Sequence, residues 1–303
     1  MKILITGATG FIGQHLLEEL KDDNLSIKII SRKINPEFWT TNRDFELYNG
    51  NIDDKLSIEP AFRDVDVVIN LAGEIKDKSR FVSTNILGVE NIIELSRKYN
   101  IGKIIHLSSV GVAGMQYSRK KIIVDENYTC NPKNDYEKTK LQSEILLKEF
   151  SKTSKTEIII LRPTNVFGDH NPRKALQGFF QHLKDNKFFP LGKNSIVNYV
   201  YVKDVAYAIN FCLQNNIENK TINIGRSISF ENFLFIASKQ LGVRYKKVQL
   251  PSLLFSLMEF FGYFGIETLK AKLRAISNCV EYNDEFMKEK IRYKYGLNEG
   301  LKI

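Results

Sequence analysis

The stretch TGATGFIG, residues 6–13, constrains this chain more than any other part of its sequence. It follows a short apolar run at residues 2–5, and a helical pattern covers residues 11–20. A strand, a glycine-rich turn and a helix therefore come in the order that a dinucleotide pyrophosphate needs. The sequence predicts such a binding site at its very start.

Each glycine of this stretch has a separate expected role. Gly7 permits the tight turn, and Gly10 lets the backbone approach the phosphates with no side chain in between. Gly13 lets the helix pack closely on the strand, and the helix N-terminus offers free N–H groups and a partial positive charge. Three glycines also occur where a strand simply ends, so the flanking strand and helix carry the prediction.

Apolar runs and helical patterns alternate through the first half of the chain. Further strands are expected at residues 27–30, 67–71, 104–107 and 158–161, with helices at 79–99 and 135–151. This rhythm predicts parallel, right-handed βαβ units and an α/β fold, a Rossmann-type doubly wound parallel sheet.

After residue 163 the alternation loosens. Helices are expected at residues 175–186, 205–214, 230–241 and 253–261, with short strands at 197–202 and 221–224. We therefore expect a dinucleotide-binding domain over residues 1–165, to which residues 197–226 return. A smaller, mixed C-terminal domain over residues 166–303 would bind the substrate.

The charge balance is basic, with 44 lysines and arginines against 35 acidic residues and a net charge of +9. Such a charge suits an anionic substrate, but it equally describes a lysine-rich, solvated surface. No stretch combines basic and aromatic residues into a nucleic-acid platform, so no nucleic-acid partner is expected.

The cysteines and the apolar segments indicate a cytoplasmic protein. Cys130, Cys212 and Cys279 form no C-x-x-C pair, which is typical of reduced thiols. The chain begins with a strand pattern, so no signal peptide is expected. The most apolar window, residues 250–266, is interrupted by Pro251 and Glu259 and is too short for a membrane span.

The second expected strand ends in Ser31-Arg32-Lys33. An acidic residue here would bind the ribose 2′-hydroxyl of NAD, and this chain has none. Arg32 and Lys33 would suit the 2′-phosphate of NADP, although a pair of solvated charges at a strand end explains them equally well. Asp53, after the third strand, is a candidate partner for the adenine amino group.

Tyr136 and Lys140 lie four residues apart at the start of a helix that Asn134 or Asp135 would cap. This spacing puts both side chains on one helix face. A tyrosine is a poor base near neutral pH unless its anion is stabilised, and a lysine ammonium and a positive nicotinamide ring would both do so. Tyr136 could then take a proton from a sugar hydroxyl.

Two serines follow the strand at residues 104–107. The carboxyl end of a central strand faces the crevice in which such sheets bind ligands. Ser109 is the preferred candidate to orient the substrate hydroxyl toward Tyr136, ahead of Ser108, and either could instead be an ordinary turn residue. His106 lies within the strand, where a packed core residue is expected. The four histidines show no metal-binding spacing, so no metal is expected.

Together these features resemble the extended short-chain dehydrogenase/reductase superfamily, in its NAD-dependent epimerase/dehydratase branch. The resemblance rests on TGATGFIG, NLAGE, STNILGVENII, SSVGVAG, YEKTK, LRPTNVFG, YVYVKDVAYAI and INIG in this order. It runs through nearly the whole chain.

The resemblance implies NAD or NADP as cofactor, a nucleotide-diphosphate sugar as substrate and a homodimer formed through the helices near residues 79–99 and 135–151. It implies a catalytic triad of Ser109, Tyr136 and Lys140, and it makes Ser109 and Asn165 substrate contacts. The implied cofactor contacts are Gly7, Thr9, Gly10, Phe11, Ile12, Gly13, Ser31, Arg32, Ile52, Asp53, Leu71, Ala72, Gly73, Asn85, Tyr136, Lys140 and Pro163.

Departures from the family pattern narrow the expected reaction. The family's 4,6-dehydratases carry an Asp-Glu pair where this chain has Val110 and Gly111, which disfavours dehydration. Common 4-epimerases have a tyrosine where this chain has Ala113. Many members carry an arginine before a late strand to hold the diphosphate, and this chain has Val197–Tyr201 there, without one; the candidates to replace it are Arg173, Lys193 and Arg274, among which the sequence does not choose.

Two reactions at C4 of the sugar stay open. An epimerase would remove and return the hydride with a retained NAD⁺, whereas a 4-ketoreductase would use NADPH once and release it. The SSVGVAG motif and the apolar tail near residue 253 look most like ketoreductases and epimerases of surface-polysaccharide pathways. A dinucleotide-binding scaffold without turnover is the rival from another class, which the intact triad argues against.

Overall fold

The computed structural model describes residues 1–20, 24–33, 45–115, 117–168, 174–185, 188–191, 194–244, 246–249, 274 and 277–300. The chain forms two compact units. The first unit consists of Met1–Gly114, Cys130–Pro163 and Val205–Ile222, and the second of Met115–Thr129, Thr164–Asp204 and Asn223–Ile303. The segment that returns to the first unit is therefore shorter than the expected 197–226.

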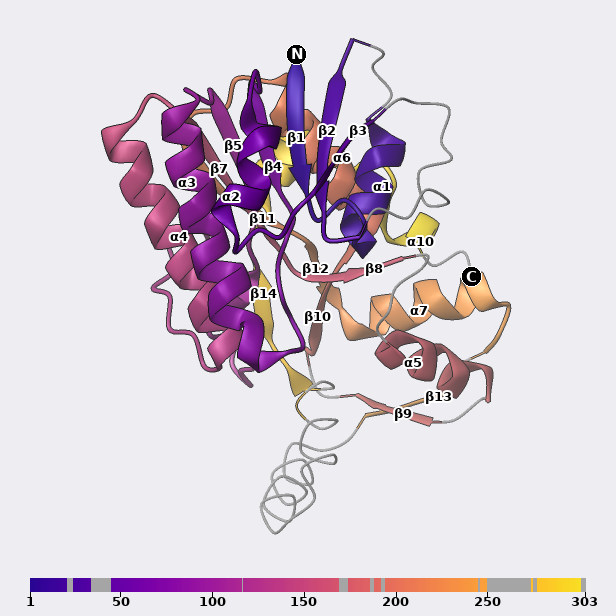
Figure 1. Ribbon diagram of the computed structural model, residues 1–303. Coiled ribbons are helices and arrows are strands. Elements are labelled where there is room, and N and C mark those ends of the chain that lie inside the picture. The colour runs from indigo at the N-terminus through magenta and orange to yellow at the C-terminus, as the bar shows by residue number, and fades with distance from the viewer. Residues whose placement is uncertain are drawn as a thin grey trace. The chain divides into compact units, whose positions relative to one another are not determined.

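A seven-stranded sheet with the order β11-β7-β5-β4-β1-β2-β3 forms the centre of the first unit (Figure 1). Its strands are β1 Lys2–Thr6, β2 Ser26–Ser31, β3 Glu46–Asn49, β4 Val67–Asn70, β5 Lys103–Leu107, β7 Glu157–Pro163 and β11 Lys220–Ile224. The pairs from β3 through β7 are all parallel. The strand order reverses between β1 and β4, and ligands bind at such a switch point. The predicted α/β fold is confirmed.

The helices of the first unit follow the apolar periodicity of the sequence. They are α1 Phe11–Glu19, α2 Lys55–Ile58, α3 Gly88–Lys98, α4 Asp135–Thr153 and α6 Val202–Gln214. Helices α3 and α4 lie side by side in Figure 1 and pack against each other. Their buried residues join alternate strand residues such as Leu4, Val68 and Ile104 in one core, as the alternating faces of a strand require.

The helix expected at residues 79–99 is present, but its first turns are not regular α-helix. A 3₁₀ turn at Lys78–Arg80 and a π turn at Ser83–Leu87 precede the α-helix that starts at Gly88. Asn85 lies inside the π turn, and its side chain bonds the backbone of Glu74 in both directions. These bonds hold the turn against the loop that follows β4, and apolar periodicity does not reveal them.

The second unit contains short mixed sheets. Strand β10 Ile196–Tyr201 pairs antiparallel with β12 Arg226–Ser229 and parallel with β8 Asn165–Phe167. Further elements are β6 Ile122–Val124, β14 Val280–Tyr282, β9 Phe188–Leu191, β13 Lys246–Gln249, α5 Lys174–Lys184, α7 Phe230–Leu241 and α10 Gly296–Gly300. Strand β6 pairs with β14, and β9 pairs with β13.

Several sequence predictions lie outside the described residues. They are the apolar window 250–266, the helix at 253–261, and the diphosphate candidates Arg173 and Lys193. Within the part of the chain that the structure describes, no helix is both long and apolar enough to cross a membrane.

Candidate active site

The glycine turn after β1 packs tightly against the segment after β4. Gly7 has a positive φ of 72°, and a Cβ there would lie 2.7 Å from the backbone nitrogen of Ala72. A Cβ on Gly13 would lie 2.4 Å from the Gly7 carbonyl oxygen, so helix α1 begins directly against the turn. Only glycine fits at either position, and the backbone N–H groups of the turn stay close to the sheet edge.

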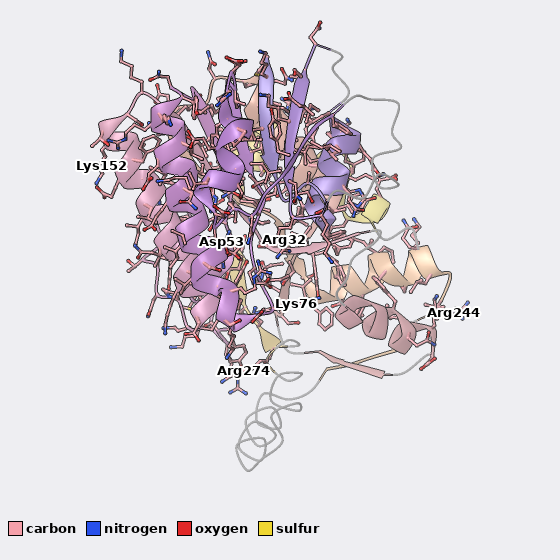
Figure 2. All side chains as sticks on the ribbon, viewed as in Figure 1. Arg32, Asp53, Lys76, Lys152, Arg244 and Arg274 are labelled. Atoms are coloured by element: carbon pink, nitrogen blue, oxygen red, sulfur yellow. The ribbon has the colours of Figure 1, made fainter. Side chains whose placement is uncertain are left out.

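A pocket of about 750 Å³ opens beside this turn, at the carboxyl ends of the strands. Its lining residues are Thr6, Gly7, Thr9, Gly10, Ile30, Ser31, Arg32, Lys33, Gly50, Asn51, Ile52, Leu71, Ala72, Gly73, Glu74, Arg80 and Thr84. Arg32, labelled in Figure 2, is the exposed residue that follows the end of β2. The pocket lies at the switch point between β1 and β4.

The structure separates the expected cofactor contacts into two groups. Those that line the pocket are Gly7, Thr9, Gly10, Ser31, Arg32, Ile52, Leu71, Ala72 and Gly73. Those outside its lining are Phe11, Ile12, Gly13, Asp53, Asn85, Tyr136, Lys140 and Pro163.

Several lining residues are not among the contacts expected from the sequence. Thr6, Gly50 and Asn51 stand directly beside predicted positions at strand ends, so the same strand-end argument identifies them. Arg80 and Thr84 had no such signal, because they lie in the 3₁₀ and π turns at the start of the expected helix and not at a strand end.

Two observations fit a dinucleotide at these residues. The space that a Cβ would fill at Gly7, Gly10 or Gly13 is already occupied by backbone, so no side chain separates the turn from the helix that follows it. The buried hydroxyl of Thr84 lines the pocket and has no hydrogen-bond partner among the described residues. Buried polar atoms without a partner are rare, and a bound ligand is one explanation.

The two serines after β5 have different partners. The Ser108 hydroxyl is buried and donates to the Glu144 carboxylate at 2.6 Å. The Ser109 hydroxyl is partly exposed and accepts the backbone N–H of Gly111 at 3.1 Å, which caps the 3₁₀ turn Val110–Ala113. Ser108 is thus committed to a buried ion pair, which leaves Ser109 as the serine that is open to a substrate.

Glu144 is the centre of a buried network behind the site. Arg162 donates to both of its carboxylate oxygens, from Nε at 2.8 Å and from Nη2 at 2.6 Å. Burial works to raise the pKa of Glu144, but Arg162 and the Ser108 hydroxyl together hold it below its ordinary value. The pair is therefore ionised, and it fixes α4 to β7 and to the end of β5.

Helix α4 carries Tyr136 and Lys140 in its first turns. The side chain of Asn134 caps the helix by accepting the Glu137 N–H at 3.0 Å, one of the two caps expected. Tyr136 is partly exposed, and its ring lies edge-on to Phe81 with centroids 6.0 Å apart. The two residues stand one helical turn apart on one face.

The Lys140 ammonium lies between the sheet and the pocket. It donates to the Leu107 carbonyl at 2.6 Å, and a Cβ on the pocket-lining Gly73 would lie 3.8 Å from its nitrogen. Only 3% of the residue is exposed. Burial lowers the pKa of Lys140 to about 8, although the negative charge of Glu144 opposes this effect.

Asn85 holds the edge of the pocket without lining it. Its amide accepts the Glu74 N–H at 2.8 Å and donates to Thr139 of α4 at 3.0 Å. The Ser143 hydroxyl donates to the Asn85 carbonyl at 2.6 Å. The side chain expected to contact the cofactor thus ties the loop after β4 to α4.

The remaining candidates lie elsewhere. Pro163 is buried at the end of β7 in the first unit. In the second unit, Asn165 is exposed on β8, and its amide donates to the Asn198 carbonyl at 3.0 Å. The guanidinium of the exposed Arg274 lies 5.4 Å from the Tyr117 ring centre.

Comparison with known proteins gives the family. Residues 3–225 match the NAD dependent epimerase/dehydratase family. The chain belongs to this family. The resemblance that the ordered motifs indicate is confirmed, and so is the prediction of a nicotinamide dinucleotide cofactor, since the family is NAD-dependent.

Curated relatives include two epimerases and a dehydratase. A "Putative UDP-glucose 4-epimerase" of Methanocaldococcus jannaschii is 32% identical over 80% of this chain and 83% of its own. A dTDP-D-glucose 4,6-dehydratase of Dictyostelium discoideum is 30% identical over 80% of this chain and 62% of its own. An N-acetyl-alpha-D-glucosaminyl-diphospho-ditrans,octacis-undecaprenol 4-epimerase of Escherichia coli O157:H7 is 30% identical over 70% and 63%.

Solved structures share the fold. A UDP-glucuronic acid 4-epimerase from Bacillus cereus in complex with NAD has a TM-score of 0.72 at 24% identity, covering 100% of this chain and 96% of that one. A UDP-glucose 4-epimerase from Thermotoga maritima with UDP-glucose has a TM-score of 0.73 at 23% identity, with the same coverage.

Replacing Gly13 by alanine should disrupt the turn. The added methyl group would collide with the Gly7 carbonyl, so we expect a loss of about 1–3 kcal/mol in the free energy of unfolding and weaker dinucleotide binding. Gly178→Ala in α5 is the matched control, because a Cβ there meets nothing within 4 Å. Urea unfolding and calorimetric titration with NAD⁺ measure both effects; unchanged stability and affinity in Gly13→Ala would contradict this packing.

The depressed pKa of Lys140 predicts that the free energy of unfolding depends on pH. Below pH 8 the lysine is charged in the folded and in the unfolded protein. Between about pH 8 and 10.5 only the unfolded chain holds the proton, so the folded protein becomes more stable as the pH rises. We expect the wild type to gain about 2 kcal/mol relative to Lys140→Met between pH 7.5 and 10 in urea unfolding. Lys152→Met, at an exposed position of α4, should show no such difference. If the difference in free energy of unfolding between the wild type and Lys140→Met does not change with pH, the pKa of Lys140 is not depressed.

Proposed function

We propose that this protein is an NAD(P)-dependent oxidoreductase of nucleotide-diphosphate sugars that acts at C4 of the sugar, foremost as a 4-epimerase. One observation carries the proposal: the Lys140 ammonium lies beside Gly73 of the dinucleotide pocket, one helical turn from Tyr136. The names of the epimerase relatives support the substrate class and the reaction.

The chain's own residues have separate roles in this reaction. When bound, the nicotinamide supplies the site that accepts and returns a hydride. Tyr136 takes the proton of the sugar 4-hydroxyl, and the Lys140 ammonium stabilises the phenolate that this requires. Ser109 orients the hydroxyl, since its own hydroxyl is not tied to the Glu144 network. The candidate cofactor contacts are those of the pocket lining.

Dehydration fits the site poorly, although a dehydratase is among the relatives. Val110 and Gly111 stand where the resemblance implies an acid and a base. A Cβ on Gly111 would lie 3.2 Å from Cγ of Glu137 and 3.3 Å from Oγ of Ser109, so this turn has little room for a longer side chain. We therefore favour reactions that leave the sugar's hydroxyl groups in place.

A 4-ketoreductase using NADPH is the second candidate, and the end of β2 favours it. Ser31, Arg32 and Lys33 all line the pocket there. Two cations at this place suit the 2′-phosphate of NADP, whereas a carboxylate would bind the 2′-hydroxyl of NAD.

The wider setting belongs to the same proposal. We expect the first unit to bind the dinucleotide and the second to bind the sugar nucleotide, with Asn165 as one contact. A homodimer formed through α3 and α4, and a cytoplasmic location, remain predictions.

Tyr136→Phe should fold, bind the dinucleotide and lose at least about 10³-fold in kcat, because it removes the proton acceptor. The assay uses UDP-glucose and UDP-N-acetylglucosamine, with the C4 epimer detected by chromatography. Tyr99→Phe is the control and should retain activity. Tyr99 lies at the C-terminal end of α3, and its hydroxyl donates to Glu59. Normal turnover by Tyr136→Phe would refute the mechanism, and an inactive wild type that binds dinucleotide would favour the scaffold.

The released cofactor distinguishes the two reactions. We expect denatured, freshly purified protein to release near-stoichiometric NAD(H), as a retained cofactor requires. An empty protein that binds NADPH at least about 10-fold better than NADH would instead indicate the ketoreductase. In that case Arg32→Ala should remove the preference, whereas Lys152→Ala, on α4 and apart from Arg32 in Figure 2, should leave it unchanged.

A further inference from the structure

Three polar side chains form a row across the buried centre of the sheet. Thr6 of β1 stands opposite Asn70 of β4, and Asn70 stands opposite His106 of β5. Each is only 1% exposed. The row lies at the carboxyl ends of the strands, and its first member, Thr6, lines the dinucleotide pocket.

The hydrogen bonds in this row run in one direction. The backbone N–H of Ala72 donates to the Thr6 hydroxyl at 3.3 Å, and that hydroxyl donates to Oδ1 of Asn70 at 2.6 Å. Nδ2 of Asn70 then lies 3.0 Å from Nδ1 of His106. An amide nitrogen only donates, so Nδ1 must accept. The single proton of a neutral His106 ring therefore sits on Nε2.

His106 is held neutral by its surroundings. Burial and, after it, the positive charge of Lys140 lower the pKa of His106 well below its ordinary value. Nε2 has no hydrogen-bond partner among the described residues. The Lys140 ammonium bonds the carbonyl of Leu107, the residue next to His106 in β5. The ring and the ammonium are thus neighbours at the end of one strand.

Among the described residues, further charges near Lys140 lie on α4 and β7. Glu144 of α4 attracts the ammonium, but its oxygens already accept Arg162 of β7 and the Ser108 hydroxyl. Lys148 reaches Glu144 at 3.4 Å from the exposed side. A cationic His106 would therefore add a second positive charge with little left to balance it.

We propose that His106 is a positioning residue for Lys140: the row from Ala72 through Thr6 and Asn70 fixes its ring as the neutral Nε2–H tautomer. This dry, uncharged ring keeps water out from the strand side of the ammonium, and it leaves the ammonium free to face the pocket. The row links the lining of the dinucleotide pocket, at Thr6, to the neighbourhood of the lysine through buried side chains.

Nitrogen NMR tests the tautomer without any turnover. In ¹⁵N-labelled protein, the spectrum of His106→Gln identifies the His106 signals. We expect the wild-type ring to be neutral and protonated at Nε2 from pH 6 to 8. Thr6→Val frees the Asn70 amide to turn over, so it should produce a mixture of tautomers. An Nδ1–H ring, or a titration near pH 6.5 in the wild type, would overturn the proposal.

The pH profile of kcat/KM tests the link to Lys140, and this part rests on the proposed function. His106→Asn keeps an acceptor for Asn70 but loses the ring, so water should reach the ammonium. We expect the alkaline limb of the kcat/KM profile to move to higher pH by about half a unit or more. His106→Gln keeps a hydrogen-bond donor near the Nε2 position, so this variant should move the limb less. Ile160→Val, opposite His106 on β7, is the packing control and should leave the limb in place.

The outcomes separate the two proposals. If no nucleotide sugar is turned over, the proposed function fails, whereas the NMR result still decides the state of His106. If both His106 variants lower kcat and leave the alkaline limb where it is, the histidine is merely a packed core residue and the positioning role is wrong.

Discussion

The structure of the first unit depends on the close approach of two backbone segments. At Gly7 the turn after β1 comes so near to Leu71 and Ala72, after β4, that a methyl group would collide with both. The Ala72 N–H also donates to the Thr6 hydroxyl. Backbone thus fills the space between these two segments. The pocket at the switch point is shaped by the residues at the other strand ends. A shift of either segment would change the pocket and the polar row beneath it together.

Much of this arrangement follows from the sequence, because strand ends are marked by residue types with strong local preferences. The buried strands are apolar and β-branched, and the glycine spacing of TGATGFIG has few structural solutions. The positions of Gly7 and Gly10 could therefore be placed in advance, whereas Ala72 came from the family resemblance and Lys140 from its spacing to Tyr136. Their roles toward a cofactor and a substrate stay predictions.

Other parts depend on tertiary contacts that no periodicity shows. Arg80 and Thr84 line the pocket from the 3₁₀ and π turns before Gly88, and the Asn85 side chain bonds this segment to Glu74. Ser108 and Ser109 look equivalent in sequence, and only the buried Glu144 distinguishes them. His106 was expected to be a packed core residue; it is buried, and its bond to Asn70 also determines its tautomer. In each case one side chain from a distant segment decides the outcome.

The buried charged residues of the first unit differ in whether another protein charge neutralises them. Glu144 and Arg162 neutralise each other and tie α4 to the sheet, so their burial is compensated by short, charge-assisted bonds. Lys140, one turn away from Glu144, donates to the Leu107 backbone carbonyl at 2.6 Å and keeps a depressed pKa. A lysine that served stability alone would gain from a carboxylate of its own. Its position beside Gly73, near the neutral His106 ring, is instead the arrangement expected of a cation whose partner arrives with the ligands.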